Sequence, residues 1–140
     1  MADALGNSRG VDGALLIVRL AVGGLMLAHG IEKLRTGLDP IEGLLAAKGL
    51  PTALAYGVPV GEILAPVLML AGVFGRVGAL ILAFNMVMSI WLAFGDKLFV
   101  VDEHGALLYE LNLLYLAGAL AILFAGSGRY SLRRGVGRLD

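Results

Sequence analysis

Long apolar runs alternate with short polar connections along the chain. Four runs with few charged residues extend over residues 13–33, 55–74, 77–94 and 107–125. A bilayer core of roughly 30 Å needs about 20 helical residues, within a range of about 17 to 25, and each run is close to that length. No amphipathic period dominates the runs, so their sides are expected to face lipid. The pattern therefore predicts an all-α fold, a polytopic integral membrane four-helix bundle that forms a single domain.

The connections predict the order of these helices in space. Only residues 75–76 separate the second run from the third, so those two helices are expected to form a tight antiparallel hairpin. The other two connections, residues 34–54 and 95–106, are longer and polar. Within the first of them, residues 40–48 are expected to form a short helix at the membrane surface, with Asp39 as its N-cap.

Composition agrees with a membrane environment and excludes several classes of function. Of the 140 residues, 59% are hydrophobic and 16% are charged, which is unlike the usual soluble domain. The 11 basic and 11 acidic residues give a net charge of zero, so no nucleic-acid partner is expected. The chain has no cysteine, which excludes dithiol chemistry and Cys-ligated iron–sulfur clusters. Any redox role therefore requires a bound cofactor, a metal or a partner.

The distribution of Lys and Arg predicts the orientation in the membrane. One side of the bundle, formed by the two tails and the turn at residues 75–76, holds Arg9, Arg76, Arg129, Arg133, Arg134 and Arg138. The opposite side holds Lys33, Arg35, Lys48 and Lys97. Because basic residues are enriched on the cytoplasmic side of membrane proteins, both termini are predicted to be cytoplasmic. The two long connections are then predicted to face outward.

Polar side chains inside the apolar runs are the candidate functional residues. An ionisable residue deep in a span costs about 2.5 to 3.5 kcal/mol on insertion scales, so each one is a hypothesis of function or pairing. With the amides beside them, these residues are Arg19, His29, Glu32, Glu62, Asn85, Glu110 and Asn112. The helical rise places Arg19 near the inner surface, Asn85 near the middle of its span and the other five in the outer half. The sequence therefore predicts a polar pocket in the outer half of the bundle.

Glu62 and His29 are predicted to form the centre of this pocket. The flanks of Glu62 carry no charge, and the residue lies too deep for its short side chain to reach the headgroups. Its carboxyl group must therefore be paired, hydrated or protonated, and His29 is the predicted partner. The same helix as Glu62 carries Pro59 and Pro66, which are expected to kink it.

Alternatives stay open for several of these residues. Arg19 can snorkel to the headgroups or pair inside the bundle. Asn112 can act as an interhelical hydrogen-bonding residue instead of a ligand contact. His29 and Glu32, three residues apart, lie on one helical face as metal ligands do, but their order is the reverse of the Glu-x-x-His motif of carboxylate-bridged bundles and occurs once. No metal site is predicted.

Several short motifs resemble those of one family of membrane proteins. The first span holds Arg-Leu-Ala-Val-Gly at residues 19–23 and His-Gly-Ile-Glu-Lys-Leu at residues 29–34. The motifs Gly-Leu-Pro, Gly-Glu-Ile, Glu-Leu-Asn-Leu-Leu and Gly-Ser-Gly-Arg-Tyr-Ser-Leu follow at residues 49–51, 61–63, 110–114 and 126–132. In order and spacing, these motifs are similar to those of the DoxX family of small bacterial and archaeal membrane proteins.

The resemblance implies a four-helix bundle in a bacterial or archaeal cell membrane, and an association with quinones and membrane oxidoreductases. It marks as motif positions, without a role for each, Arg19, His29, Lys33, Glu62, Asn85 and Asn112. The first functional hypothesis is a membrane subunit of a redox system that binds a quinone or a small oxidisable substrate in the polar pocket. His29 and Glu62 would exchange protons there. Contacts to the ligand would come from Asn85, Asn112, Glu32, Glu110 and Arg19.

Two other functions stay open beside this hypothesis. A membrane-embedded Glu on a kinked helix is also typical of a proton-coupled small-molecule transporter. A non-catalytic membrane anchor or assembly subunit would use the same polar groups for packing alone. The expected partners are the lipid bilayer with a soluble or membrane oxidoreductase, or a second copy of this chain. The sequence does not identify a cofactor, and a quinone is the candidate.

Overall fold

The computed structural model describes residues 2–134 and 137–140, and the side chains from residue 9 onward. Its helices are α1 (Ala2–Thr36), α2 (Asp39–Ala47), η1 (Thr52–Gly57), η2 (Val60–Leu64), α3 (Ala65–Ala71), α4 (Gly75–Phe94), η3 (Gly95–Lys97) and α5 (Glu110–Ala125). The described residues form no strand beyond an isolated bridge between Val101 and Leu107. The all-α prediction is confirmed.

Three helical segments are long and apolar enough to cross a membrane: Arg9–Thr36, Thr52–Ala71 and Gly75–Lys97. The fourth apolar helix, α5, has 16 residues and is about 24 Å long at 1.5 Å per residue, which is shorter than a bilayer core of roughly 30 Å. The chain is therefore a helical membrane protein with three helices of spanning length and one shorter apolar helix.

The fourth helix begins later than its apolar run because the residues before it form a turn. The side chain of Asp102 accepts hydrogen bonds from the backbone N–H groups of His104 and Ala106, at 2.8 and 3.0 Å. These bonds hold the chain in a tight loop whose ends meet in the bridge between Val101 and Leu107. Helical hydrogen bonding consequently starts at Glu110 rather than at residue 107.

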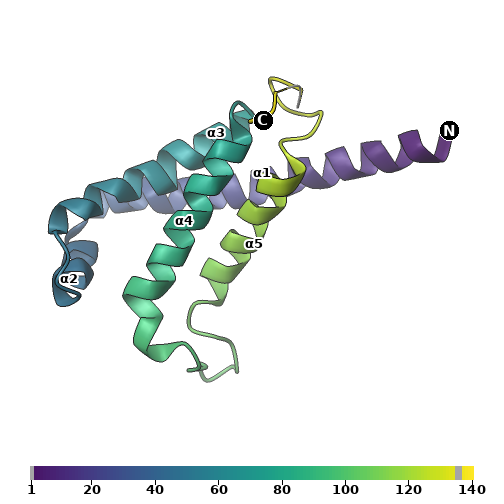
Figure 1. Ribbon diagram of the computed structural model, residues 1–140. Helices are drawn as coiled ribbons and strands as arrows, with labels where there is room; N and C mark the ends of the chain where they lie inside the picture. Colours follow the sequence, from purple (N-terminus) through teal and green to yellow (C-terminus); the bar gives the residue numbers. More distant parts are fainter. Residues whose placement is uncertain (1, 135–136) are drawn as a thin grey trace.

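The helices pack as two antiparallel pairs. Figure 1 shows α1 beside the segment formed by η2 and α3, and α4 beside α5, with the second pair running obliquely to the first. The predicted hairpin of the second and third spans is present as α3 and α4. Helix α2 lies at one end of the bundle, which we call the α2 end, and the carboxyl tail lies at the opposite end, near the turn between α3 and α4.

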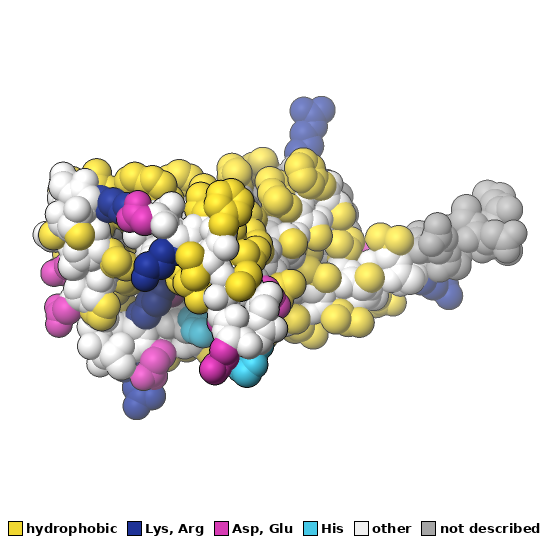
Figure 2. Space-filling view, turned by 90° about the horizontal axis from the view of Figure 1, so that it is seen from below, with side chains coloured by type: hydrophobic (Ala, Val, Ile, Leu, Met, Phe, Trp, Pro, Cys, Tyr) yellow, Lys and Arg dark blue, Asp and Glu magenta, His cyan; other side chains and the backbone are white. Residues whose placement is uncertain are grey.

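Small residues and Met fill the space between the helices. Met26, Met69, Leu82 and Ile122, which come from all four long segments, are buried. A Cβ added at Gly118 would overlap the side chain of Val22, so the close approach of α5 to α1 requires a glycine. Such close approach stabilises helix pairs in lipid. Figure 2 shows hydrophobic side chains over the flank of the bundle and charged side chains gathered toward the α2 end.

The second spanning segment changes its helical type near Pro59 and Pro66, the residues at which a kink is predicted. It begins as the 3-10 helix η1, passes through the π-helical turn η2 and continues as the α-helix α3. Pro66 has no N–H group, so the carbonyl of Glu62 lacks the α-helical partner four residues ahead. The N–H of Ala65 instead bonds the carbonyl of Val60, five residues back. Glu62 therefore lies in a π turn, a local structure that is frequent at functional sites.

Helix α2 differs from its prediction at its first residue. Leu38 occupies the N-cap position, Asp39 is already helical, and no side chain caps the helix. The prediction of Asp39 as the N-cap is therefore wrong. Glycines with positive φ lie on both sides of α2, Gly37 at +97° and Gly49 at +71°, where glycine avoids the steric cost of a side chain.

Candidate functional site

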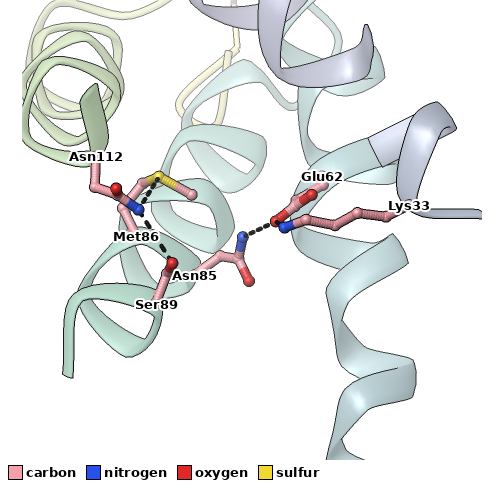
Figure 3. Close-up of polar contacts among 6 residues, drawn as sticks. All are labelled: Lys33, Glu62, Asn85, Met86, Ser89 and Asn112. Atoms are coloured by element: carbon pink, nitrogen blue, oxygen red, sulfur yellow. Dashed lines mark hydrogen bonds and ion pairs between the residues drawn. The ribbon is translucent and has the colours of Figure 1, made fainter. Parts of the chain in front are cut away.

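A buried carboxylate on the π turn is the centre of the candidate site. Glu62 is only 3% exposed. Its Oε1 atom accepts hydrogen bonds from Lys33 Nζ at 2.5 Å and from Asn85 Nδ2 at 3.4 Å, as Figure 3 shows. Its Oε2 atom is buried and has no hydrogen-bond partner among the described residues. Because buried polar atoms are nearly always paired in native proteins, this oxygen is suited to bind a proton or a hydrogen-bond donor from outside the chain.

Two glycines bring the three helices of this cluster together. A Cβ at Gly30 of α1 would overlap the carbonyl oxygen of Glu62, so α1 can touch the π turn only where it has no side chain. A Cβ at Gly61 would lie 2.5 Å from Cγ of Asn85 on α4. The cluster of Lys33, Glu62 and Asn85 therefore depends on these glycine positions as much as on its polar residues.

The cluster forms part of the wall of a cavity of about 530 Å³. This volume lies within the roughly 300 to 1,000 Å³ of typical small-molecule sites. Its polar lining residues are Lys33, Glu62, Asn85 and Ser89. The rest of the wall is apolar and comes from α2, η1, η2 and α4, with Ile41, Leu44, Leu45, Leu54, Val58, Val60, Ile81, Phe84, Met88 and Leu92. The cavity thus suits an apolar molecule with a small polar group.

A second polar contact joins α4 to α5 next to the cavity. Asn112 Nδ2 donates to Ser89 Oγ at 3.0 Å and lies 4.0 Å from the sulfur of Met86 (Figure 3). Asn112 makes this interhelical hydrogen bond and does not line the cavity, whereas Ser89 does both. Since the nitrogen of Asn112 supplies the hydrogen in this bond, the O–H of Ser89 can donate to a molecule in the cavity.

The partner of Glu62 is Lys33 and not the predicted His29. Lys33 lies four residues after His29, on the same side of α1. Side chains in a helix point toward its amino end, and the long Lys33 side chain therefore reaches back to the depth of Glu62. His29 is exposed and packs edge-on against the ring of Tyr115, with 5.9 Å between ring centroids.

Lys33 is the residue of the candidate site that the hydrophobic pattern alone did not indicate. At the end of an apolar run, a lysine is normally a solvated helix end. The available signal was its four-residue spacing from His29, which puts both on one face of α1, together with its place in the motif at residues 29–34. Its side chain is 38% exposed, so part of it remains accessible beside the carboxylate.

Arg19 lies at the opposite end of the bundle from the cavity. It is 1% exposed and pairs inside the bundle instead of snorkelling. Its guanidinium group donates to four backbone carbonyls, those of Met69 at 2.7 Å, Leu70 at 2.5 Å, and Ser127 and Tyr130, each at 2.9 Å. These bonds tie α1 to the end of α3 and to the carboxyl tail, so the structure gives Arg19 a place in the scaffold.

The two remaining predicted carboxylates also lie outside the cavity. Glu32 is exposed and lies 3.9 Å from the guanidinium group of Arg35. Glu110 is exposed at the start of α5. Among the residues with described side chains, no three His, Cys, Asp or Glu residues gather as metal ligands would. The cavity therefore gathers Glu62 and Asn85 from the predicted site residues, with Lys33 and Ser89 added.

Helix α2 covers the cavity at the α2 end. Leu44 and Leu45 line the cavity from this helix, and Leu45 is its buried residue. After the helix, Lys48 forms an ion pair with Asp96 at 3.2 Å and lies over the ring of Trp91, 6.0 Å from its centroid. These contacts join the residue after α2 to α4 and η3.

The family comparison agrees with the sequence motifs between residues 19 and 63, and the motifs at residues 110–114 and 126–132 lie outside the matched segment. The family model for DoxX matches residues 14–95. This segment runs from α1 to the end of α4 and contains every residue that lines the cavity. No curated protein and no solved structure matches the chain.

Proposed function

The chain belongs to the DoxX family of membrane proteins, and from this premise we propose that it is a membrane subunit of a redox system. We propose that it binds a quinone, or a small oxidisable molecule of similar shape, in the cavity around Glu62. The observation that carries this proposal is the single polar cluster of Lys33, Glu62 and Asn85 in the wall of an otherwise apolar cavity.

The hydrogen-bond donors of the cavity support a ligand with carbonyl oxygens. Lys33 has three N–H groups and uses one of them on Glu62. Ser89 has a free O–H for a ligand, and Asn85 has a second N–H on its amide. The positive charge of Lys33 is balanced by Glu62, so a neutral ligand fits better than an anion. The apolar wall suits a quinone ring, with its carbonyl bound by Lys33 and oriented by Asn85.

The carboxyl group of Glu62 is the proposed site of proton exchange. Reduction of a quinone adds two electrons and two protons, so a group that holds a proton near the carbonyl is required. Lys33 and Asn85 occupy one oxygen of Glu62, and the other has no hydrogen-bond partner. That oxygen would take up one proton and pass it to the nearer carbonyl of the ligand, and the other carbonyl would take the second proton from water. The electrons come from a partner oxidoreductase.

Binding of a quinone analogue to the purified protein tests the proposal. We expect a ubiquinone or menaquinone analogue to bind the wild type. Lys33→Met and Asn85→Leu remove the donors and should weaken binding by at least tenfold. His29→Ala is the matched comparison, because His29 does not line the cavity, and it should bind as the wild type does. Failure of the wild type to bind any quinone analogue would refute the proposed function.

The alternatives predict different results in the same preparation. An exporter of small cations requires a carboxylate that faces its substrate, whereas Lys33 places a positive charge next to Glu62. Proton-coupled flux in proteoliposomes that is lost in Glu62→Gln would nevertheless establish transport. An anchor or assembly subunit would retain full function in Glu62→Gln and would copurify with a soluble partner.

The orientation and partners follow from the same proposal. Both termini are proposed to lie in the cytoplasm of a bacterial or archaeal cell, because most Arg residues lie at the end opposite α2. The α2 end and the polar cluster are then in the outer half of the cell membrane. The proposed redox partner is a soluble or membrane oxidoreductase or a second copy of this chain.

A further inference from the structure

We propose that the cavity opens sideways into the bilayer between η2 and α4, and that this opening admits the hydrocarbon tail of the ligand. The ligand would then be an amphiphile dissolved in the membrane, with its head group at Lys33 and its tail among the lipids. The inference rests on the proposed function only for the identity of the head group.

Two side chains on the cavity wall also have large exposed areas. Val60 on η2 is 43% exposed and Phe84 on α4 is 65% exposed, and both line the cavity. In a membrane, an exposed apolar side chain on a spanning helix faces lipid. One side of each residue therefore faces the cavity and another side faces the bilayer. Together they form the rim of a lateral opening.

The cavity is elongated in the direction that a tail requires. On α4 its lining residues extend from Ile81 to Ala93, a distance of about 18 Å at 1.5 Å per residue. Phe84 lies at the middle of α4, which runs from Gly75 to Phe94. The lateral opening is therefore near the middle of the bilayer, where hydrocarbon tails are found.

The other end of the cavity lies beneath helix α2, on the aqueous side. The covering helix α2 places Ile41, Leu44 and Leu45 across it, and Lys48 is held by Asp96. The polar cluster lies at the level of the lateral opening, because Glu62 follows Val60 by two residues on η2 and Asn85 is next to Phe84 on α4. A head group at Lys33 with a tail that leaves sideways past Val60 and Phe84 fits this arrangement.

Two valines of similar exposure allow a matched test of the opening. Val60→Phe adds bulk at the rim, and Val67→Phe adds the same bulk at a residue that is 44% exposed and does not line the cavity. The ligands are a benzoquinone with a decyl tail and the same ring without a tail. Quenching of the fluorescence of Trp91, the single Trp of the chain, reports binding.

We expect Val60→Phe to weaken binding of the tailed ligand by at least tenfold and to change binding of the tailless ring by less than threefold. Val67→Phe should change neither. Equal effects of Val60→Phe on both ligands, or no effect on either, would overturn the lateral opening. Failure of both ligands to bind the wild type would instead refute the proposed function, so the two failures are distinguishable.

A photoreactive group at the end of the tail locates the tail directly. After irradiation in liposomes and digestion, the label is expected on peptides that contain Val60 or Phe84. Excess tailless ring should reduce this labelling if the head group anchors the probe. A label on α2 or on the connection at residues 95–109 would contradict the proposal, because the tail would then leave toward the aqueous side.

Discussion

Lys33 Nζ lies 2.5 Å from Oε1 of Glu62 and joins the last turns of α1 to the π turn of the second spanning segment. The glutamate side chain is 4% exposed and the lysine side chain is 38% exposed. The pair is therefore asymmetric, since a charge that cannot reach water depends on a charge that can. The stability of the protein should consequently respond more strongly to loss of the lysine than to loss of the whole pair.

Lys33→Met should destabilise the protein by about 2 to 3 kcal/mol, below the roughly 3 to 5 kcal/mol for one partner of a fully buried pair. The reason is that Glu62 would stay buried without its cation. Thermal or denaturant unfolding in detergent measures the change. The double variant with Glu62→Gln should recover most of the loss, because no charge is then left buried. If the double variant is as unstable as the sum of the single variants, the pairing is not the cause.

The ion pair between Lys48 and Asp96 provides the matched control for Lys33. The side chain of Asp96 is 88% exposed, and exposed pairs contribute at most about 1 kcal/mol. Lys48→Met should therefore lower the free energy of unfolding by less than about 1 kcal/mol. A loss as large as that of Lys33→Met would show that any lysine in this region has the same effect.

Gly30→Ala should destabilise the contact between α1 and η2. The new Cβ would overlap the carbonyl oxygen of Glu62, so the two helices must separate, at a cost of about 1 to 3 kcal/mol. Gly24→Ala is the control on the same helix, because its Cβ meets nothing within 4 Å and alanine is favoured over glycine in a helix. The melting temperature in detergent should fall for the first variant and stay equal or rise for the second.

The hydrophobic pattern was sufficient to predict the helices but not the contacts between them. Apolar runs indicate which residues face lipid or the core. They predicted the carboxyl ends of the helices near residues 13–33 and 77–94 to within a few residues. They carry no information on the rotation of one helix against another. For this reason the pattern placed Glu62 on a spanning segment, where the structure buries it, but did not identify its partner. The partner depends on the contact made at Gly30, which brings Lys33 to the carboxylate.

The function of Arg19 could not be derived from the pattern for a related reason. Its partners are four backbone carbonyls, and backbone carbonyls are present at every residue of every sequence. Only the positions of the end of α3 and of the carboxyl tail reveal that these carbonyls point at the guanidinium group. A charged residue can therefore be buried in a membrane protein and paired with backbone groups alone. Residue types in the sequence do not predict such a pairing.

Gly57→Leu should block the cavity without harming the fold. Gly57 lines the cavity, and a Cβ added there meets nothing within 4 Å, so the leucine side chain has room to enter the space that the ligand requires. Binding of a quinone analogue should fall by at least tenfold while the melting temperature stays the same or rises. Gly43→Leu on α2 also has open space but does not line the cavity, and it should bind as the wild type does. Normal binding to Gly57→Leu would place the ligand elsewhere.

Arg19→Met should separate a scaffold role from a ligand-binding role. The substitution leaves four carbonyls without their donor, and hydrogen bonds to charged groups contribute about 1.5 to 3 kcal/mol each. Because such contributions are not additive, we expect a loss of at least about 3 kcal/mol in the free energy of unfolding. Arg35→Met on the same helix removes an arginine whose side chain is 76% exposed and should change stability by less than about 1 kcal/mol.

At a temperature where both variants are folded, each should bind the quinone analogue with the affinity of the wild type, because Arg19 lies at the end of the bundle away from the cavity. Weaker binding by folded Arg19→Met, with unchanged stability, would show that Arg19 takes part in ligand binding.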